Sequence, residues 1–268
     1  MLKVAIIGAS GRMGAQLIDA VIASDQAELV AAITHKSSAA LGQDVGLHNR
    51  KPAVGLCYSD DLLAAAKAAD VLVDFSLPAA LADNLAAAVQ QTKPIVVCTT
   101  GLNDRQQGEL HSAASKTAVL YAANTSLGVN LLIALVRTAS KALGNRCDIE
   151  ILEAHHSAKR DAPSGTALAL GEAAASGRGQ CLNEVAEYQR NHTQSAYRAG
   201  SIGFATLRGG DIVGEHTVYL IAGGERIELT HRAASRQTFA DGALNAALWI
   251  AQQPVGLYQM KHVLGLDD

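Results

Sequence analysis

The N-terminal segment constrains the fold of this chain more than any other. A strand-like run at residues 2–7 stops at the glycine-rich turn GASGRMG, residues 8–14, and a helical pattern begins at residue 16. A second strand-like run follows at residues 29–34. The order of strand, G-x-x-G-x-x-G turn, helix and strand is typical of a dinucleotide-binding unit, because the glycines let the backbone approach a pyrophosphate. The alternative is a tight turn that simply requires glycine.

The alternation of strands and helices continues to residue 122. Strand-like segments lie at residues 70–75, 94–98 and 118–122, and helical patterns lie at 78–91 and 104–116. This order predicts an α/β fold, a Rossmann-like doubly wound parallel sheet with helices on both faces.

Ligands of such folds bind at the carboxyl ends of the strands. The turns at that edge therefore supply the candidate cofactor-binding residues. These are Gly8, Ala9, Ser10, Gly11, Arg12, Met13, Thr34, His35, Lys36, Cys98, Thr99, Thr100, Ala122, Ala123, Asn124 and Thr125.

The end of the second strand bears on which cofactor binds. An NAD-selective site usually has Asp or Glu there to accept the ribose hydroxyls. This chain has Thr34, His35 and Lys36 instead, followed by Ser37. A 2′-phosphate meets no repelling carboxylate there, which favours NADPH, with NADH left open. The alternative is that His35 and Lys36 are ordinary solvated surface residues.

The segment EAHHSAKRDAPSGTA, residues 153–167, concentrates cationic and polar chemistry after a strand-like run at 147–154. His155 and His156 are adjacent, and Lys159 follows in a loop. Histidines donate and accept protons near neutral pH, and a lysine brings a mobile positive charge. We expect a proton-transfer and anion-binding site here.

A helix is predicted to start immediately after that loop. Ser164 is a plausible N-cap, so the amides of Gly165 and Thr166 point outward as anion donors. Metal ligation is the weaker alternative, because nothing nearby has H-x₃-H or C-x₂-C spacing. A purely structural role for the histidines and the lysine is the other alternative.

The pattern changes after residue 200. Alternating strands at residues 201–208, 211–222 and 226–233 are joined by glycine turns, and a helix is expected at 239–252. This predicts a smaller α+β domain with an antiparallel or mixed sheet. The tail at 255–266 is expected to return to the first domain. The expected domains are residues 1–126 with 236–268 for the dinucleotide, and 127–235 for substrate and oligomerisation.

Composition excludes several classes of protein. The chain has 268 residues and a formal net charge of −3, so it has no overall attraction to nucleic acid or anionic membranes. Its apolar runs read as strand-sized, and its N-terminus enters the first strand at once, leaving no room for a signal peptide. The four cysteines are far apart, which favours reduced thiols in a cytoplasmic protein.

These motifs together resemble the 4-hydroxy-tetrahydrodipicolinate reductase family, also called dihydrodipicolinate reductases. The resemblance runs nearly end to end, and its most specific part is the His-His-x-x-Lys-x-Asp-Ala-Pro-Ser-Gly-Thr run. The other matching segments are VAIIGASGRMG, the TTG at 99–101, AANTSLGVN at 122–130 and IGFATLRGGDIVGEHTVYL at 202–220.

The resemblance implies an oxidoreductase of lysine and diaminopimelate biosynthesis that uses NADPH or NADH on a cyclic dicarboxylate. It implies that His155 is the general acid and that Lys159 donates a proton and binds a carboxylate. His156, Gly165 and Thr166 match residues that hold the substrate carboxylates. It also implies a homotetramer formed through the mixed sheet. The charge, the apolar runs and the ligand spacing separately lead us to expect no metal, membrane or nucleic-acid partner.

Two other functions stay open at this stage. A semialdehyde or sugar dehydrogenase on the same fold is one, and for the semialdehyde enzyme Cys98 is the candidate nucleophile. A nucleotide-sensing regulator is the other, although the sequence has no DNA-binding helix pair or basic stripe to support it.

Overall fold

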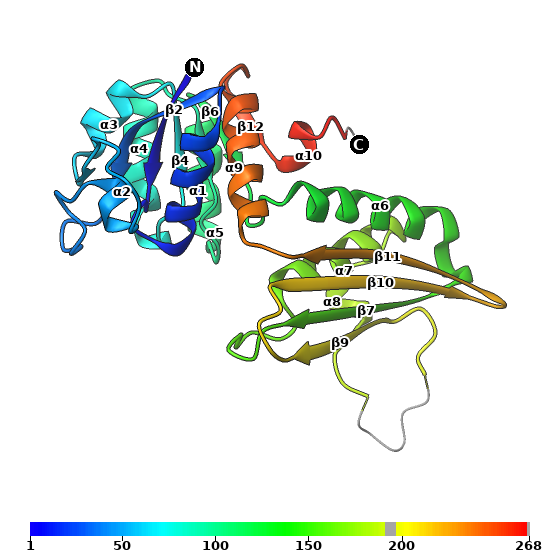
Figure 1. Cartoon of the computed structure of the whole chain (residues 1–268). Coiled ribbons are helices and arrows are strands. Elements are labelled where there is room, and N and C mark those ends of the chain that lie inside the picture. The colour runs from blue at the N-terminus through cyan, green and yellow to red at the C-terminus, as the bar shows by residue number, and fades with distance from the viewer. Residues whose placement is uncertain (191–196, 267–268) are drawn as a thin grey trace. The chain divides into compact units, whose positions relative to one another are not determined.

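The computed structural model describes residues 1–190 and 197–266, and these form two compact units. Unit 1 comprises Met1–Leu127 and Arg236–Asp268, and unit 2 comprises Gly128–Ser235. Each unit has its own sheet, visible as separate sets of arrows in Figure 1.

Unit 1 is built on a seven-stranded sheet in the order β12-β6-β5-β4-β1-β2-β3. Every strand pair in it is parallel, so the predicted Rossmann-like sheet is confirmed. The tail does return to this unit, since β12 pairs with β6. The strands are β1 Leu2–Ile7, β2 Ala27–Ile33, β3 Tyr58–Ser59, β4 Val71–Asp74, β5 Ile95–Val97, β6 Ala118–Tyr121 and β12 Gly256–Tyr258.

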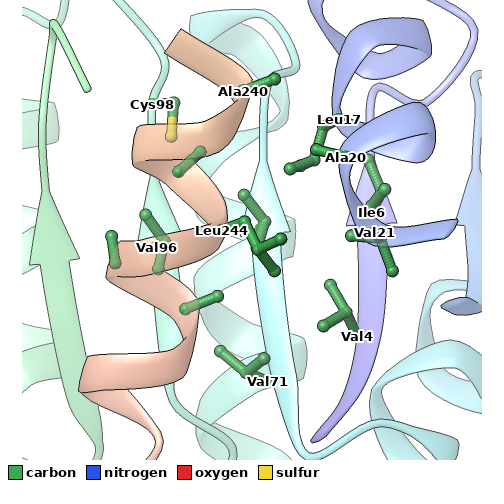
Figure 2. Packing of buried hydrophobic residues seen from close by; sticks show 14 of the residues in the cluster. Val4, Ile6, Leu17, Ala20, Val21, Val71, Val96, Cys98, Ala240 and Leu244 are labelled. Carbon is green, nitrogen blue, oxygen red and sulfur yellow. The ribbon is translucent and has the colours of Figure 1, made fainter. Parts of the chain in front are cut away.

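Apolar side chains cover both faces of this sheet, as a parallel sheet requires. Val4 and Ile6 of β1 pack with residues of α1 and α9, whereas Ala5 and Ile7 pack with residues of α3, α4 and α5. Figure 2 shows the side chains packed between the sheet and helices α1 and α9, with Leu244 close to the strand side chains. The helices of unit 1 are α1 Arg12–Ala23, α2 Val45–His48, α3 Leu62–Ala68, η1 Pro78–Ala80, α4 Leu81–Gln90, α5 Asp104–Ala114, α9 Gln237–Ile250 and α10 Met260–Val263.

Unit 2 contains a five-stranded sheet in the order β11-β10-β7-β9-β8. β7 is parallel to β9 and antiparallel to β10, so the expected mixed sheet is confirmed. Buried residues of α6 and α7 pack on one face. The strands are β7 Asp148–His155, β8 Ala186–Glu187, β9 Ile202–Arg208, β10 Gly214–Ala222 and β11 Glu225–Ala233; the helices are α6 Leu127–Leu143, η2 Gly144–Arg146, α7 Gly165–Gly177 and α8 Leu182–Val185.

Two sequence expectations need correction in unit 2. The strand expected from residue 211 begins at Gly214, because residue 211 ends a turn and residues 212 and 213 have no regular structure. The long helix α6 was not predicted, and the view that apolar runs are only strand-sized is wrong there. By length and composition alone, Leu127–Arg146 is apolar enough to cross a membrane, with a mean hydropathy of 1.3. Its Leu132 and Val136 pack into the core of unit 2, but only 22% of its apolar window is buried.

Candidate functional site

The glycine turn after β1 is shaped by close backbone contacts. Gly8 has a φ of +76°, and a Cβ there would lie 2.7 Å from backbone atoms of Phe75. A Cβ on Gly14 would lie 2.5 Å from the carbonyl oxygens of Gly8 and Ala9. The first helix α1 starts after Gly11 without a side-chain cap. The turn therefore presents uncapped helix amides at the carboxyl edge of the sheet, which is the donor set that a pyrophosphate needs.

The end of β2 is tied to this glycine turn. The hydroxyls of Ser10 and Thr34 lie 2.5 Å apart, and Thr34 is buried. Beyond it, His35 and Lys36 are exposed, and Nδ1 of His35 lies 2.6 Å from Oγ of Ser37. No carboxylate occupies residues 34–37.

Asp74 at the end of β4 organises the next two turns, a role that sequence reasoning missed. It is fully buried, and its carboxylate accepts hydrogen bonds from Ser76 N at 2.7 Å and Asn84 Nδ2 at 2.9 Å. The Thr99 hydroxyl donates to it at 3.4 Å, and Cys98 N donates to its carbonyl at 2.8 Å. A polar residue at the end of a buried strand was the available signal.

Cys98 is poorly suited to act as a nucleophile. Burial, with the nearby Asp74 carboxylate as a second cause, raises the pKa of the Cys98 thiol well above its usual value. A thiol that stays protonated is weakly nucleophilic. The semialdehyde-dehydrogenase alternative depended on this residue, so the structure gives it no support.

The turn after β6 completes the edge. Asn124 accepts a hydrogen bond from Ser126 N at 2.9 Å through its side-chain oxygen, which holds the turn. The hydroxyl of Thr125 donates to the carbonyl of Phe239 at 2.6 Å, so this side chain is directed into unit 1. The candidate residues after β1, β2, β5 and β6 thus share the carboxyl edge of one parallel sheet, with Thr100 and Ala123 exposed there.

Unit 2 gathers its polar residues at the end of β7. Ile149 and Ile151 on the buried face of this strand belong to the core, and the next residues on that face are Glu153 and His155. Glu153 stands opposite Thr206 of β9 and His216 of β10, and His155 stands opposite Arg208. Sheet register therefore assembles a polar row at the carboxyl end of β7.

Glu153 is the centre of this row and is only 1% exposed. Arg208 donates to both of its oxygens at 2.8 Å, and Thr206 Oγ1 donates to Oε1 at 3.2 Å. Ser164 N donates to Oε1 at 3.1 Å, and His155 Nδ1 lies 2.6 Å from Oε2. Burial alone raises the pKa of Glu153, but the hydrogen bonds from Arg208 and His155 outweigh it and hold the pKa below its usual value.

His155 and His216 are both buried histidines whose neutral form is favoured. Burial lowers the pKa of His155, and the hydrogen bond to Glu153 only partly restores it. Burial, with the charge of His155 as the next cause, lowers the pKa of His216 to about 4. The two rings lie 5.1 Å apart edge to face, and His216 Nε2 lies 2.9 Å from the Ser164 hydroxyl.

The loop after His155 places the other predicted residues. Lys159 pairs with Asp161 at 2.8 Å, and its charge is close enough to lower the pKa of His155. Ser164 caps α7 by accepting from Ala167 N at 3.1 Å, as predicted. Of the remaining predicted substrate-binding residues, His156 and Thr166 are half-buried and Gly165 is exposed.

Sequence reasoning missed Thr206, Arg208 and His216 altogether, and it gave Glu153 no role although this residue opens the quoted motif. Only the alternation of β7 offered a signal, because Glu153 and His155 are two residues apart and share a face. No group of three or more potential metal-ligating side chains occurs in residues 1–190 and 197–266.

Comparisons with known proteins agree with this geometry. The family described as "Dihydrodipicolinate reductase, N-terminus" matches residues 2–125, and "Dihydrodipicolinate reductase, C-terminus" matches residues 128–264. The chain belongs to the dihydrodipicolinate reductase family. Family members are pyridine-nucleotide-dependent oxidoreductases.

Individual relatives span the whole chain. A 4-hydroxy-tetrahydrodipicolinate reductase of Psychrobacter arcticus is 48% identical over 268 residues, covering 100% of this chain and 96% of the relative. One of Zymomonas mobilis is 50% identical over 265 residues, covering 99% and 98%. The dipicolinate-bound dihydrodipicolinate reductase from Paenisporosarcina sp. TG-14 has the same fold, with a TM-score of 0.77, 24% identity and 97% of each chain covered.

Proposed function

We propose that this chain is an NAD(P)H-dependent reductase that converts 4-hydroxy-tetrahydrodipicolinate to tetrahydrodipicolinate, with release of water, in the diaminopimelate route to lysine. The observation that carries the proposal is the polar cluster of unit 2. There Glu153 holds His155 at 2.6 Å next to a loop lysine and a capped helix start. Full-length relatives that are 48% to 50% identical have this named activity.

The start of α7 and its preceding loop supply the groups that a dicarboxylate needs. The amides of Gly165 and Thr166 lie in the first turn, where the helix dipole favours an anion. Lys159 leaves Asp161 to pair with a substrate carboxylate, and His156 adds a ring nitrogen as a donor. Holding both carboxylates fixes the orientation of the substrate ring.

His155 supplies the proton that the reduction needs. Its pKa is below the usual value in the protein alone, because burial favours the neutral ring. The negative charges of a bound dicarboxylate favour the protonated ring and so raise that pKa again. The acid therefore becomes charged when the substrate that consumes its proton is present. Lys159 supports the transfer by stabilising negative charge as it develops.

The carboxyl edge of unit 1 holds the nucleotide in this proposal. When bound, the reduced nicotinamide supplies the hydride. The residues from Gly8 to Met13 hold the pyrophosphate through backbone amides. Residues 98–100 and 122–125 line the nicotinamide side, where Thr125 contributes the shape of its turn because its hydroxyl is bonded to Phe239.

NADPH is the preferred cofactor in this proposal. Thr34 is buried against Ser10 at the end of β2, which leaves the exposed His35 and Lys36 to meet a 2′-phosphate. No acidic side chain lies at 34–37 to accept the ribose hydroxyls of NADH or to repel the phosphate.

We also propose that the chain forms a homotetramer through the mixed sheet. Its proposed location is the cytoplasm. Ile221 of β10 is 37% exposed and Ile227 of β11 is 43% exposed. All four cysteines are free, which suits a reducing compartment. Light scattering is expected to give four times the mass of the 27.8 kDa chain, and a monomer would contradict the assembly.

The test is steady-state reduction of freshly prepared 4-hydroxy-tetrahydrodipicolinate, with NADPH and NADH compared in parallel. We expect turnover with both cofactors and a higher kcat/KM with NADPH. Absence of turnover with either cofactor, in protein that still binds the nucleotide, would overturn the substrate assignment and favour a nucleotide-sensing role.

A further inference from the structure

Glu153 connects parts of unit 2 that the proposed reaction uses separately. One oxygen accepts from the amide of Ser164, which caps α7, and the other lies 2.6 Å from His155. Arg208 donates to both oxygens from the neighbouring strand β9. The same carboxylate therefore contacts the proton donor and the start of the anion-binding helix.

We propose that Glu153 is a positioning residue that fixes His155 as the Nδ1–H tautomer, so that Nε2 is the nitrogen that exchanges the reaction's proton. This inference rests on the proposed function for the identity of the reaction. It does not depend on that function for its measurement, because the tautomer is a property of the protein alone.

The hydrogen-bond pattern of Glu153 determines the tautomer. Arg208 and the Ser164 amide are obligatory donors, so the carboxylate is ionised and can only accept. His155 Nδ1, 2.6 Å from this acceptor, must then carry a hydrogen. In the neutral ring Nε2 has a lone pair; in the charged ring Nε2–H is the proton that can leave.

A glycine of the neighbouring strand lies beside the opposite edge of the ring. A Cβ on Gly214 would lie 3.1 Å from His155 Nε2, closer than most Cβ contacts. Gly214 begins β10, so this strand approaches Nε2 with a bare backbone. In the transfer the Nε2–H bond breaks as the substrate gains the proton, and His155 is left neutral with Nδ1–H still bonded to Glu153.

Charges from every element around the ring affect its protonation. Glu153 on β7 favours the charged ring, whereas Arg208 on β9 and Lys159 in the following loop oppose it. His216 on β10 lies edge to face with His155 and is neutral above a pH of about 4, since burial, then the charge of His155, lowers its pKa to about that value. Glu153 and Arg208 therefore act on His155 with opposite signs.

The variants Glu153→Gln and Arg208→Gln test this opposition. Glu153→Gln removes the favourable charge, so His155 should titrate at a pH lower by about one unit. Arg208→Gln removes an opposing charge, so His155 should titrate at a pH higher by about one unit. Histidine NMR titrations measure both shifts, and the pH dependence of kcat/KM should move in the same two directions.

A matched control separates charge from packing. Thr206→Val removes a neutral donor to Glu153 at nearly constant volume, and it should leave the titration of His155 within a few tenths of a pH unit of the wild type. A merely structural role for Glu153 would reduce activity at every pH without opposed shifts. Shifts of the same sign in the two Gln variants would overturn the proposal.

The wild-type protein provides a test that no folding defect can obscure. With ¹⁵N-labelled histidine, the neutral His155 ring should show a protonated Nδ1 and an unprotonated Nε2. The reverse tautomer would overturn the proposal directly. Failure of the protein to reduce 4-hydroxy-tetrahydrodipicolinate, with this tautomer in place, would instead remove only the proposed function.

Discussion

The two candidate sites of this molecule are built from different chemical groups. The edge of unit 1 consists of backbone: a glycine with a φ of +76°, a helix start without a side-chain cap, and turns held by local hydrogen bonds. The cluster of unit 2 consists of buried ionisable side chains, centred on Glu153 and His155.

This difference has physical consequences. Backbone amides keep the same hydrogens at every accessible pH, so a site made from them is insensitive to pH but intolerant of added atoms. Buried ionisable groups depend on their partners, so a cluster of them responds to pH and to the loss of a single charge. Proton transfer needs the second kind of site, and holding a cofactor phosphate is well served by the first.

The largest effect is expected from the mobile charge of unit 2. Lys159→Ala should lower kcat/KM by about 100- to 10,000-fold, with kcat falling and KM rising, because both carboxylate binding and charge stabilisation are lost. Steady-state kinetics measures this. Lys141→Ala, on the exposed side of α6, is the control and should keep wild-type values. Unchanged kinetics for Lys159→Ala would refute its role.

An added methyl group in the glycine turn of unit 1 should destabilise the fold by steric conflict. Gly8→Ala combines a positive φ with a Cβ placed 2.7 Å from the backbone of Phe75, and it should lower the free energy of unfolding by about 4 kcal/mol. Gly55→Ala is the matched control, since Gly55 has a φ of +80° but nothing within 4 Å of its Cβ. Urea denaturation compares them. Equal losses would mean that the approach to Phe75 is unimportant.

The pH sensitivity of unit 2 should appear in its stability. Burial, then the charge of His155, lowers the pKa of His216 from 6.5 to about 4, so the unfolded chain binds a proton in that range that the folded protein does not. The stability present above pH 6.5 is therefore lost as the pH falls toward 4, by about 3 kcal/mol.

Urea midpoints measured between these two pH values test this loss. His216→Gln, which cannot titrate, should reduce the pH-dependent loss by about that 3 kcal/mol. Thr217→Val on the same strand is the control and should keep the wild-type slope. The same pH slope in His216→Gln and the wild type would contradict the assignment.

The smallest effect is expected from Lys36, an exposed charged side chain proposed to act at the edge of unit 1. Lys36→Ala should raise the KM for NADPH about tenfold and leave the KM for NADH nearly unchanged, because only the first cofactor has a 2′-phosphate. The exposed Lys67→Ala in α3 is the control. Equal changes for both cofactors would exclude Lys36 as the phosphate partner.

The success of sequence analysis differed between the two units. In unit 1 the glycine turn and the alternation of apolar runs depend on residues that are close along the chain, and the predicted parallel sheet is confirmed. In unit 2 the helix α6 was missed, because its apolar residues were not recognised as helical. The capped start of α7 was found, because a cap is a local signal.

The partners of Glu153 lay beyond sequence reasoning. Thr206 and Arg208 are 53 and 55 residues away, and only the parallel pairing of β7 with β9 brings them opposite the motif. His216 arrives through the antiparallel pairing of β7 with β10.

The sequence by itself determined the fold of unit 1 and the family, and it predicted a site at residues 155–166, because these depend on local spacing and on specific motifs. The tertiary structure alone decided that Glu153 binds His155 and Arg208, and that Cys98 is buried as a thiol. Strand register and burial set those contacts and protonation states. Both arise only when distant segments pack together and exclude water.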